Sequence, residues 1–203
     1  LHINIYDGRV DFMNKDTTQI FMTELDTYLF GQGTHYEIYN KMGAHLAVKN
    51  GKEGVYFVVW APKAKEVYVV GDFNDWRAYG YDMKPVSDGG VYELFVEGAR
   101  AGQCYKFLII SQDGEALYKA DPYANAAQLR PETASVITDL TGFKWTDDKW
   151  VENKKKEDHL SSAMSIYECH IGSWRKQKDG TKDGYMNYRD IAHELAEYVS
   201  DMG

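Results

Sequence analysis

Glu66 begins the segment EVYVVGDFNDW, which ends at Trp76 and joins a strand signal to a turn signal. The first half is rich in valine and tyrosine, a composition that favours a pleated, half-buried surface. The second half, Gly71-Asp-Phe-Asn-Asp75, is rich in residues that form turns. The segment therefore predicts a β-strand that stops in a short polar turn.

This turn carries two aromatic residues, Phe73 and Trp76, beside Asn74 and Asp75. A flat indole among hydrogen-bonding side chains has the chemistry that holds a sugar, because the ring stacks on the apolar face of a pyranose while polar groups bind its hydroxyls. The alternative is that the two rings close the end of a β-sandwich. The segment alone leaves both interpretations open.

Strand patterns recur at short intervals around this segment, with glycine-rich turns and no helix between them. Strands of this length and spacing are typical of an antiparallel β-sandwich. We therefore predict a mainly β chain, with the sandwich over residues 31–140. The predicted strands cover residues 46–49, 54–60, 66–71, 91–96, 105–110, 115–119 and 135–138, and an Asn50-Gly51 hairpin turn separates the first two.

The N-terminal extension, residues 1–30, has a partly helical pattern. Apolar residues near helical spacing predict a helix over residues 16–30. Residues 34–39 are predicted to be a short extended piece. Trp60 lies inside a predicted strand, and we expect its side chain in the core.

The pattern changes class after residue 140. Residues 141–163 are predicted to be a linker, and the charge run over residues 152–158 is interpreted as solvated. Residues 165–171 are strand-like. A helix is predicted to begin near Asn187, which is an N-cap candidate.

The apolar face of this last helix consists of Ile191, Ala192, Leu195, Ala196, Val199 and Met202. A β/α unit buries its helix against a sheet, which requires a neighbouring strand. We therefore expect residues 164–203 to be the opening of an α/β domain that this chain does not complete.

The bulk composition bounds the possible partners. The chain has 203 residues, 44% of them hydrophobic and 14% aromatic, and a formal net charge of -8. An acidic chain without a basic stripe is a poor candidate for nucleic acid or for an anionic membrane surface. It has no apolar run long enough to span a bilayer and no signal-peptide pattern. We expect the protein to be cytoplasmic and monomeric.

Cofactor and metal signals are weak. Cys104 and Cys169 lie far apart in strand-like runs, and we expect both to be buried, reduced thiols. The six histidines show no metal-ligand spacing, and the glycines follow no phosphate-binding pattern. We therefore predict no metal site and no cofactor.

Four groups of motifs lie along the chain. They are Tyr28-Leu-Phe-Gly-Gln-Gly-Thr-His-Tyr36 with Gly43-Ala-His45, Val59-Trp-Ala-Pro62 with the segment ending at Trp76, Gly102-Gln-Cys-Tyr-Lys-Phe107 with Lys119-Ala-Asp-Pro-Tyr-Ala124 and Arg130-Pro-Glu-Thr-Ala-Ser135, and Met164-Ser-Ile-Tyr-Glu-Cys-His-Ile-Gly-Ser-Trp-Arg175 with the helix from Asn187. Together these motifs resemble those of 1,4-α-glucan branching enzymes of the bacterial type. The resemblance covers residue 28 to the end of the chain, and residues 1–27 match nothing recognisable.

The resemblance implies a particular architecture and activity. The sandwich would be an immunoglobulin-like, family 48 carbohydrate-binding module, and residues 164–203 would be the first β/α unit of a truncated (β/α)8 barrel. The family is a retaining transglycosylase that cleaves α-1,4-glucan and forms α-1,6 branches in glycogen synthesis. Its catalytic carboxylates belong to later barrel strands, so the resemblance implies no catalytic residue in this chain, which should bind α-glucan and be inactive alone.

The resemblance also implies the binding residues. Trp76 would stack on a glucosyl ring, Lys106 would donate to sugar hydroxyls, and Asn74 would add a polar contact. Stand-alone glycogen-binding modules carry a second stacking aromatic, where this chain has Asp113-Gly-Glu-Ala116, and an asparagine, where Ile137 stands. We therefore expect weak binding.

Two other functions fit parts of the sequence. One is an independent glycogen-binding or regulatory module without catalysis, which the β/α pattern at the end of the chain disfavours. The other is the N-terminal part of a debranching enzyme of the α-amylase superfamily. The motifs Thr34-His35 and Gly172-Ser-Trp174 favour the branching enzyme over the debranching enzyme.

Overall fold

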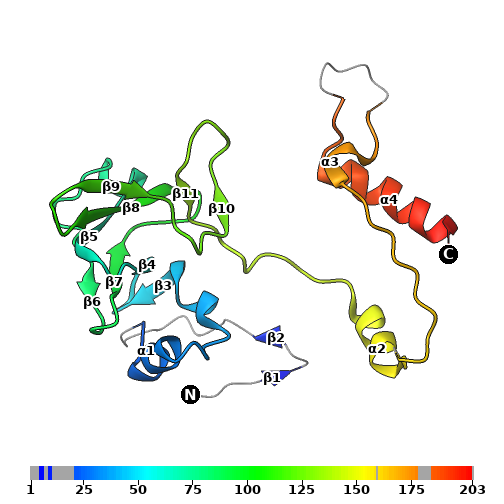
Figure 1. Cartoon of the computed structure of the whole chain (residues 1–203), viewed down its shortest axis with the longest axis horizontal. Coiled ribbons are helices and arrows are strands. Elements are labelled where there is room, and N and C mark those ends of the chain that lie inside the picture. The colour runs from blue at the N-terminus through cyan, green and yellow to red at the C-terminus, as the bar shows by residue number, and fades with distance from the viewer. Residues whose placement is uncertain (1–4, 7–8, 11–20, 159, 178–183, 203) are drawn as a thin grey trace. The chain divides into compact units, whose positions relative to one another are not determined.

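The structure is a computed structural model that describes residues 5–6, 9–10, 21–158, 160–177 and 184–202. The chain divides into two compact units, Leu1–Phe143 and Lys144–Gly203, and each is described by itself. The first unit holds every sheet that the described residues form (Figure 1). The second holds three helices of the described chain.

The first unit is built on two antiparallel sheets, as predicted (Figure 1). One sheet has the order β3-β4-β7-β6; the other has the order β10-β11-β8-β5, with β9 also paired to β8. A separate hairpin joins β1 to β2. The strands are β1 (Ile5–Tyr6), β2 (Arg9–Val10), β3 (Gly43–Lys49), β4 (Lys52–Trp60), β5 (Ala64–Gly71), β6 (Lys84–Pro85), β7 (Val91–Glu97), β8 (Cys104–Ser111), β9 (Ala116–Lys119), β10 (Ala126–Ala127) and β11 (Ser135–Val136).

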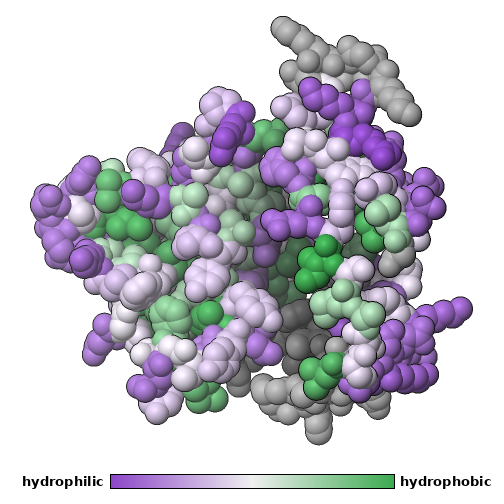
Figure 2. All heavy atoms as spheres, turned by 45° about the vertical axis from the view of Figure 1, so that its right-hand side comes forward, coloured by the Kyte–Doolittle hydropathy of each residue, from purple (hydrophilic) through white to green (hydrophobic). Residues whose placement is uncertain are grey.

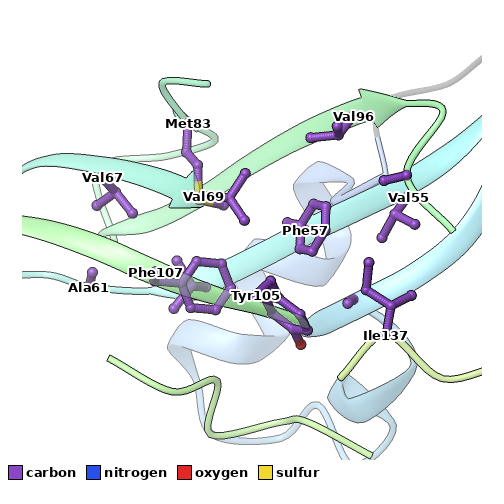
Figure 3. Close-up of a cluster of buried hydrophobic side chains, with 13 residues drawn as sticks. Val55, Phe57, Ala61, Val67, Val69, Met83, Val96, Tyr105, Phe107 and Ile137 are labelled. Atoms are coloured by element: carbon purple, nitrogen blue, oxygen red, sulfur yellow. The ribbon is translucent and has the colours of Figure 1, made fainter. Parts of the chain in front are cut away.

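The hydrophobic core lies between these two sheets (Figure 3). Val67 and Val69 of β5 belong to it, as their alternation in the sequence predicted. Phe57 of β4 meets Tyr105 of β8 edge to face, with ring centroids 5.0 Å apart. Because each fully buried side chain of this size stabilises a fold by roughly 1.5–3 kcal/mol, this layer supplies the main force that holds the sheets together.

The Asn50-Gly51 turn joins β3 to β4, as predicted. Both residues have positive φ, 52° at Asn50 and 76° at Gly51. Two consecutive left-handed residues match the twist of the flanking strands in a two-residue hairpin. This turn sets the register in which Lys49 pairs with Lys52.

A segment before β3 covers the outer face of the β3-β4-β7 sheet. It contains helix α1 (Glu24–Gly31) and the 3-10 helix η1 (Ile38–Asn40). Phe21 stacks on Tyr56 of β4 with centroids 4.8 Å apart, and Met22 is 1% exposed. A second buried cluster therefore lies on the side of this sheet that faces away from the main core.

Three predictions for the N-terminal half change. The helix predicted over residues 16–30 is confirmed from Glu24, whereas residues 16–20 lie outside the described chain. The prediction of an extended piece over residues 34–39 is wrong, because residues 36–37 form a turn and η1 begins at Ile38. The prediction that the Trp60 side chain lies in the core is wrong. Trp60 is 54% exposed, because it lies on the outer face of the sheet at the end of β4, where its Nε1 donates to the Gly89 carbonyl.

The second unit contains helices α2 (Asp148–Lys156), α3 (Ile171–Trp174) and α4 (Tyr188–Met202) (Figure 1). Helix α2 makes residues 152–156 of the charge run helical, and residues 152–158 are all exposed, which confirms the interpretation that this run is solvated. The predicted strand over residues 165–171 is absent: residues 165–170 form no strand. A barrel strand is completed by hydrogen bonds to neighbouring strands, and no described segment of this unit supplies them.

The predicted start of the last helix is confirmed. Asn187 accepts hydrogen bonds from the backbone N–H groups of Arg189 and Asp190, both at 3.0 Å, which is the geometry of an N-cap. Of the predicted apolar face, Ile191 is buried, whereas Val199 is 43% exposed and Met202 is 69% exposed. Figure 2 shows apolar residues, in green, among polar ones on the face of the molecule that it presents.

Candidate functional site

The candidate site lies on the outer face of the sheet that contains β5, β8 and β9. Successive side chains of a strand point to opposite faces. Tyr105 and Phe107 of β8 point into the core, so Lys106 and Leu108 point outward. Figure 3 shows the inward side of this arrangement, with Tyr105 and Phe107 in the core.

Trp76 lies in the turn that follows β5 and is 39% exposed. Its backbone N–H donates to the Gly71 carbonyl at 3.0 Å, which closes the turn. Asp75 and Trp76 both have positive φ, 52° and 60°. A positive φ is unfavourable for a bulky residue. The contacts around Trp76 therefore stabilise a backbone conformation that this residue rarely adopts, and this conformation sets the position of the indole.

Asp72 fixes the direction of this indole. The Nε1 of Trp76 donates to Asp72 Oδ1 at 3.1 Å, and the backbone N–H of Cys104 donates to Asp72 Oδ2 at 2.7 Å. One carboxylate therefore joins the turn after β5 to the first residue of β8. Burial, and then the charge of Asp72, raise the pKa of the Cys104 thiol, which favours its neutral form.

Lys106 lies two residues further along β8, opposite Val70 of β5. Its Nζ donates to Thr133 Oγ1 at 2.7 Å. Thr133 belongs to the segment between β10 and β11, so a loop distant in sequence holds the ammonium group in place. An ammonium group has three donors, and this contact uses one of them.

Asn74, the third predicted site residue, is 8% exposed. Its Oδ1 accepts from the Gly71 N–H at 2.9 Å, and its Nδ2 donates to the Val69 carbonyl at 3.1 Å. Both polar atoms of the amide thus bind backbone groups at the end of β5. Asn74 shapes the turn that presents Trp76, and the structure does not bring its amide together with Trp76 and Lys106.

Tyr118 of β9 is an exposed aromatic residue that the sequence reasoning missed. It pairs with Leu108 in the sheet, so it shares the outward face with Lys106, and it is 56% exposed. The expected gap at Asp113-Gly-Glu-Ala116 is thus followed, two residues later, by a second ring. Ile137 is 1% exposed in the core and offers no surface contact.

A buried polar pair supports the site from the inner side of the sheet. The Tyr105 hydroxyl donates to Asp121, and the Asp121 N–H donates to Ser135 Oγ at 2.9 Å. Burial raises the pKa of both Tyr105 and Asp121. This network ties β8 to Ser135, the first residue of β11, which follows the segment that carries Thr133.

The described part of the chain offers neither a metal-binding cluster nor a membrane-spanning helix. Within residues 5–6, 9–10, 21–158, 160–177 and 184–202, no cluster of three or more histidine, cysteine or acidic side chains could hold a metal ion. No helix among these residues has the length and apolar character needed to cross a membrane.

Part of this chain matches a known protein family, and most of it is similar to known enzymes. Residues 41–124 match the family described as Carbohydrate-binding module 48 (Isoamylase N-terminal domain). The chain is 54% identical over 184 residues to the 1,4-alpha-glucan branching enzyme GlgB of Butyrivibrio fibrisolvens, covering 91% of this chain and 29% of that enzyme. It is 48% identical over 180 residues to the corresponding enzyme of Protochlamydia amoebophila, covering 89% of this chain and 24% of that enzyme.

A solved structure is also similar. Klebsiella pneumoniae pullulanase complexed with maltotriose is 27% identical, with 49% of this chain and 10% of that chain covered and a TM-score of 0.39. At that TM-score the match adds nothing to the fold described above. The chain thus spans 24% to 29% of the length of the two branching enzymes it resembles.

Proposed function

We propose that this chain, whose residues 41–124 match the carbohydrate-binding module 48 family, is the N-terminal part of a 1,4-α-glucan branching enzyme. The observation that carries the proposal is the identity of 54% to a branching enzyme over 91% of the chain. Such an enzyme would cleave an α-1,4-glucan and transfer the released piece to form an α-1,6 branch during glycogen synthesis.

The contribution of this chain would be to bind α-glucan. The exposed indole of Trp76 and the ring of Tyr118 are flat apolar surfaces on which glucosyl rings can stack, and the ammonium group of Lys106 can donate to hydroxyls. Asp72 and Asn74 act on Trp76 and its turn and contact no sugar. Two rings in place of one raise the expected affinity above that of a single stacking platform.

The division of labour follows from this assignment. Residues 31–140 would be the binding module, residues 141–163 the linker, and residues 164–203 the start of the catalytic (β/α)8 barrel. The carboxylates of a retaining mechanism lie about 5–5.5 Å apart at the ends of barrel strands. We assign none of them to this chain, so its role in catalysis would be to raise the local concentration of glucan near a tethered active site.

Two assays on the 203-residue chain test this function. Calorimetric titration with maltoheptaose should show binding, and incubation with amylose should leave iodine staining unchanged. Absence of binding by a folded chain would refute the module assignment. A fall in iodine staining would refute the assignment of the catalytic carboxylates to the remainder of the enzyme.

A further inference from the structure

The candidate site continues across the sheet in one row of side chains. Asp82 pairs with Tyr68 of β5, Tyr68 pairs with Leu108 of β8, and Leu108 pairs with Tyr118 of β9. Paired residues of antiparallel strands point to the same face. All four side chains therefore lie on the face that presents Lys106, in the row next to it.

Leu108 forms the floor of this row. It is 7% exposed although it points away from the main core, whereas Tyr118 beside it is 56% exposed. Neighbouring strands lie about 4.8 Å apart, so Tyr68 and Tyr118 stand about 10 Å apart on either side of Leu108. That span is too wide for one sugar ring and suits a chain of several.

Glu66 contacts Tyr68, and Asp82, which pairs with Tyr68 in the sheet, carries a second charge beside it. The Tyr68 hydroxyl donates to Glu66 Oε2 at 2.6 Å, which fixes the orientation of the phenol. Asp82 forms an ion pair with Lys84, which is 70% exposed. An aromatic ring bordered by a carboxylate and an ammonium group offers both an apolar surface and acceptors and donors for hydroxyls.

We propose that Tyr68, Glu66 and Asp82 form a further subsite for α-glucan, continuous with the surface of Trp76, Lys106 and Tyr118. The inference rests on the proposed binding function and adds the length of the ligand. A short maltooligosaccharide occupies the surface at Trp76 and Lys106. A longer one crosses Tyr118 and Leu108 and reaches Tyr68, so the face selects longer chains.

A glucan fits this row better than a protein partner does. The rings are separated and bordered by Glu66 and the Asp82–Lys84 pair, whereas the core of a protein interface is depleted of charged groups. The row is also continuous in register with the candidate sugar-binding surface. Successive units of a hydroxyl-rich polymer can contact the separated rings and the polar groups between them.

The test compares maltotriose and maltoheptaose by calorimetric titration of the 203-residue chain. Tyr68→Ala should weaken maltoheptaose binding by about fivefold, the effect of one lost ring contact, and change maltotriose binding by less than about twofold. Glu66→Gln should give a smaller loss of the same kind. Tyr79→Ala is the matched control, because Tyr79 is 95% exposed in the loop before this row.

The outcomes separate the subsite from the binding function itself. Binding of neither ligand by the unsubstituted chain would overturn both. The subsite alone would be overturned by the following pair of results. Trp76→Ala loses binding, and the ratio of the maltoheptaose affinity to the maltotriose affinity is the same in the unsubstituted chain, Tyr68→Ala and Glu66→Gln. Should Tyr68→Ala unfold, as seen by circular dichroism, Glu66→Gln decides: an unchanged ratio overturns the subsite.

Discussion

The carboxylate of Asp72 holds the indole of Trp76 through a hydrogen bond of 3.1 Å from Nε1 to Oδ1. The same carboxylate accepts the Cys104 N–H at 2.7 Å, so the indole is anchored to β8 as well as to its own turn. Ordering a large side chain before its ligand arrives reduces the entropy lost on binding. This link explains how a residue with φ of 60° is kept in one orientation.

Replacement of Asp72 by alanine should therefore weaken binding without removing the stacking ring. We expect a rise of about threefold to tenfold in the Kd for maltoheptaose, because the indole would have to be ordered at each binding event. Asp72→Asn, which keeps an acceptor oxygen, should lose less. An affinity of Asp72→Ala equal to that of the unsubstituted chain would contradict the positioning role.

The ring of Trp76 itself should matter more than its anchor. Trp76→Ala should weaken maltoheptaose binding by more than about tenfold, because it removes the largest apolar surface of the site. Trp76→Phe keeps a ring and should recover part of the affinity. The measurement is retention on a glucan-containing native gel, with circular dichroism to show that both variants are folded. Equal retention of all three proteins would return Trp76 to a purely structural role.

Lys106 and Thr133 should act as a pair. Lys106→Met should raise the Kd by about fivefold, because a charged donor to the sugar hydroxyls is lost. Thr133→Val removes only the hydroxyl that orients the ammonium group and should cost less. A double-mutant cycle on maltoheptaose affinity measures their coupling, and strict additivity of the two losses would show that Thr133 does not position Lys106.

Tyr105 should contribute to stability and not to binding. Tyr105→Phe leaves Asp121 buried without its hydroxyl donor, so we expect a loss of about 1–3 kcal/mol in the free energy of unfolding. The maltoheptaose affinity of the folded variant should stay within about twofold, because the ring points away from the candidate site. Urea unfolding followed by tryptophan fluorescence gives the first value. A variant as stable as the parent would show that this hydrogen bond makes no net contribution to the free energy of unfolding.

Asp26 should make the first unit sensitive to acid. Burial by itself would raise the pKa of Asp26, but hydrogen bonds from His35 and Thr23 and the charge of Lys41 outweigh it and lower the pKa from 3.8 to about 2. The ionised carboxylate of Asp26 therefore stabilises the folded state above pH 4, and this contribution is lost as the pH falls from 4 toward 2. After allowance for solvent screening, it amounts to about 1–2 kcal/mol.

Asp26→Asn tests this dependence. The variant should be less stable than the parent by that amount at pH 6, and the difference should shrink as the pH falls toward 2, because the parent loses its ionised carboxylate. Thermal unfolding across pH 2–6 measures it. A difference that stays constant over the whole range would mean that Asp26 acts through packing and not through its charge.

Local patterns predicted most of the first unit. The alternation from Val67 to Val70 and the Asn50-Gly51 pair are signals carried by neighbouring residues, and both gave the correct strand and turn. The predicted strand over residues 165–171 failed for the opposite reason. Its hydrogen bonds must come from another strand, and no property of those residues supplies that strand.

For the candidate site, local sequence patterns were enough to place Trp76 after a polar turn and Lys106 on a strand. They could not show that both polar atoms of the Asn74 amide bind the backbone of Val69 and Gly71, because these contacts exist only in the folded turn. Tyr118 was missed because it reaches the face of Lys106 through the pairing of β9 with β8. Strand register and burial depend on residues far apart in the chain, so the side chains that meet on this face are known only from the folded structure.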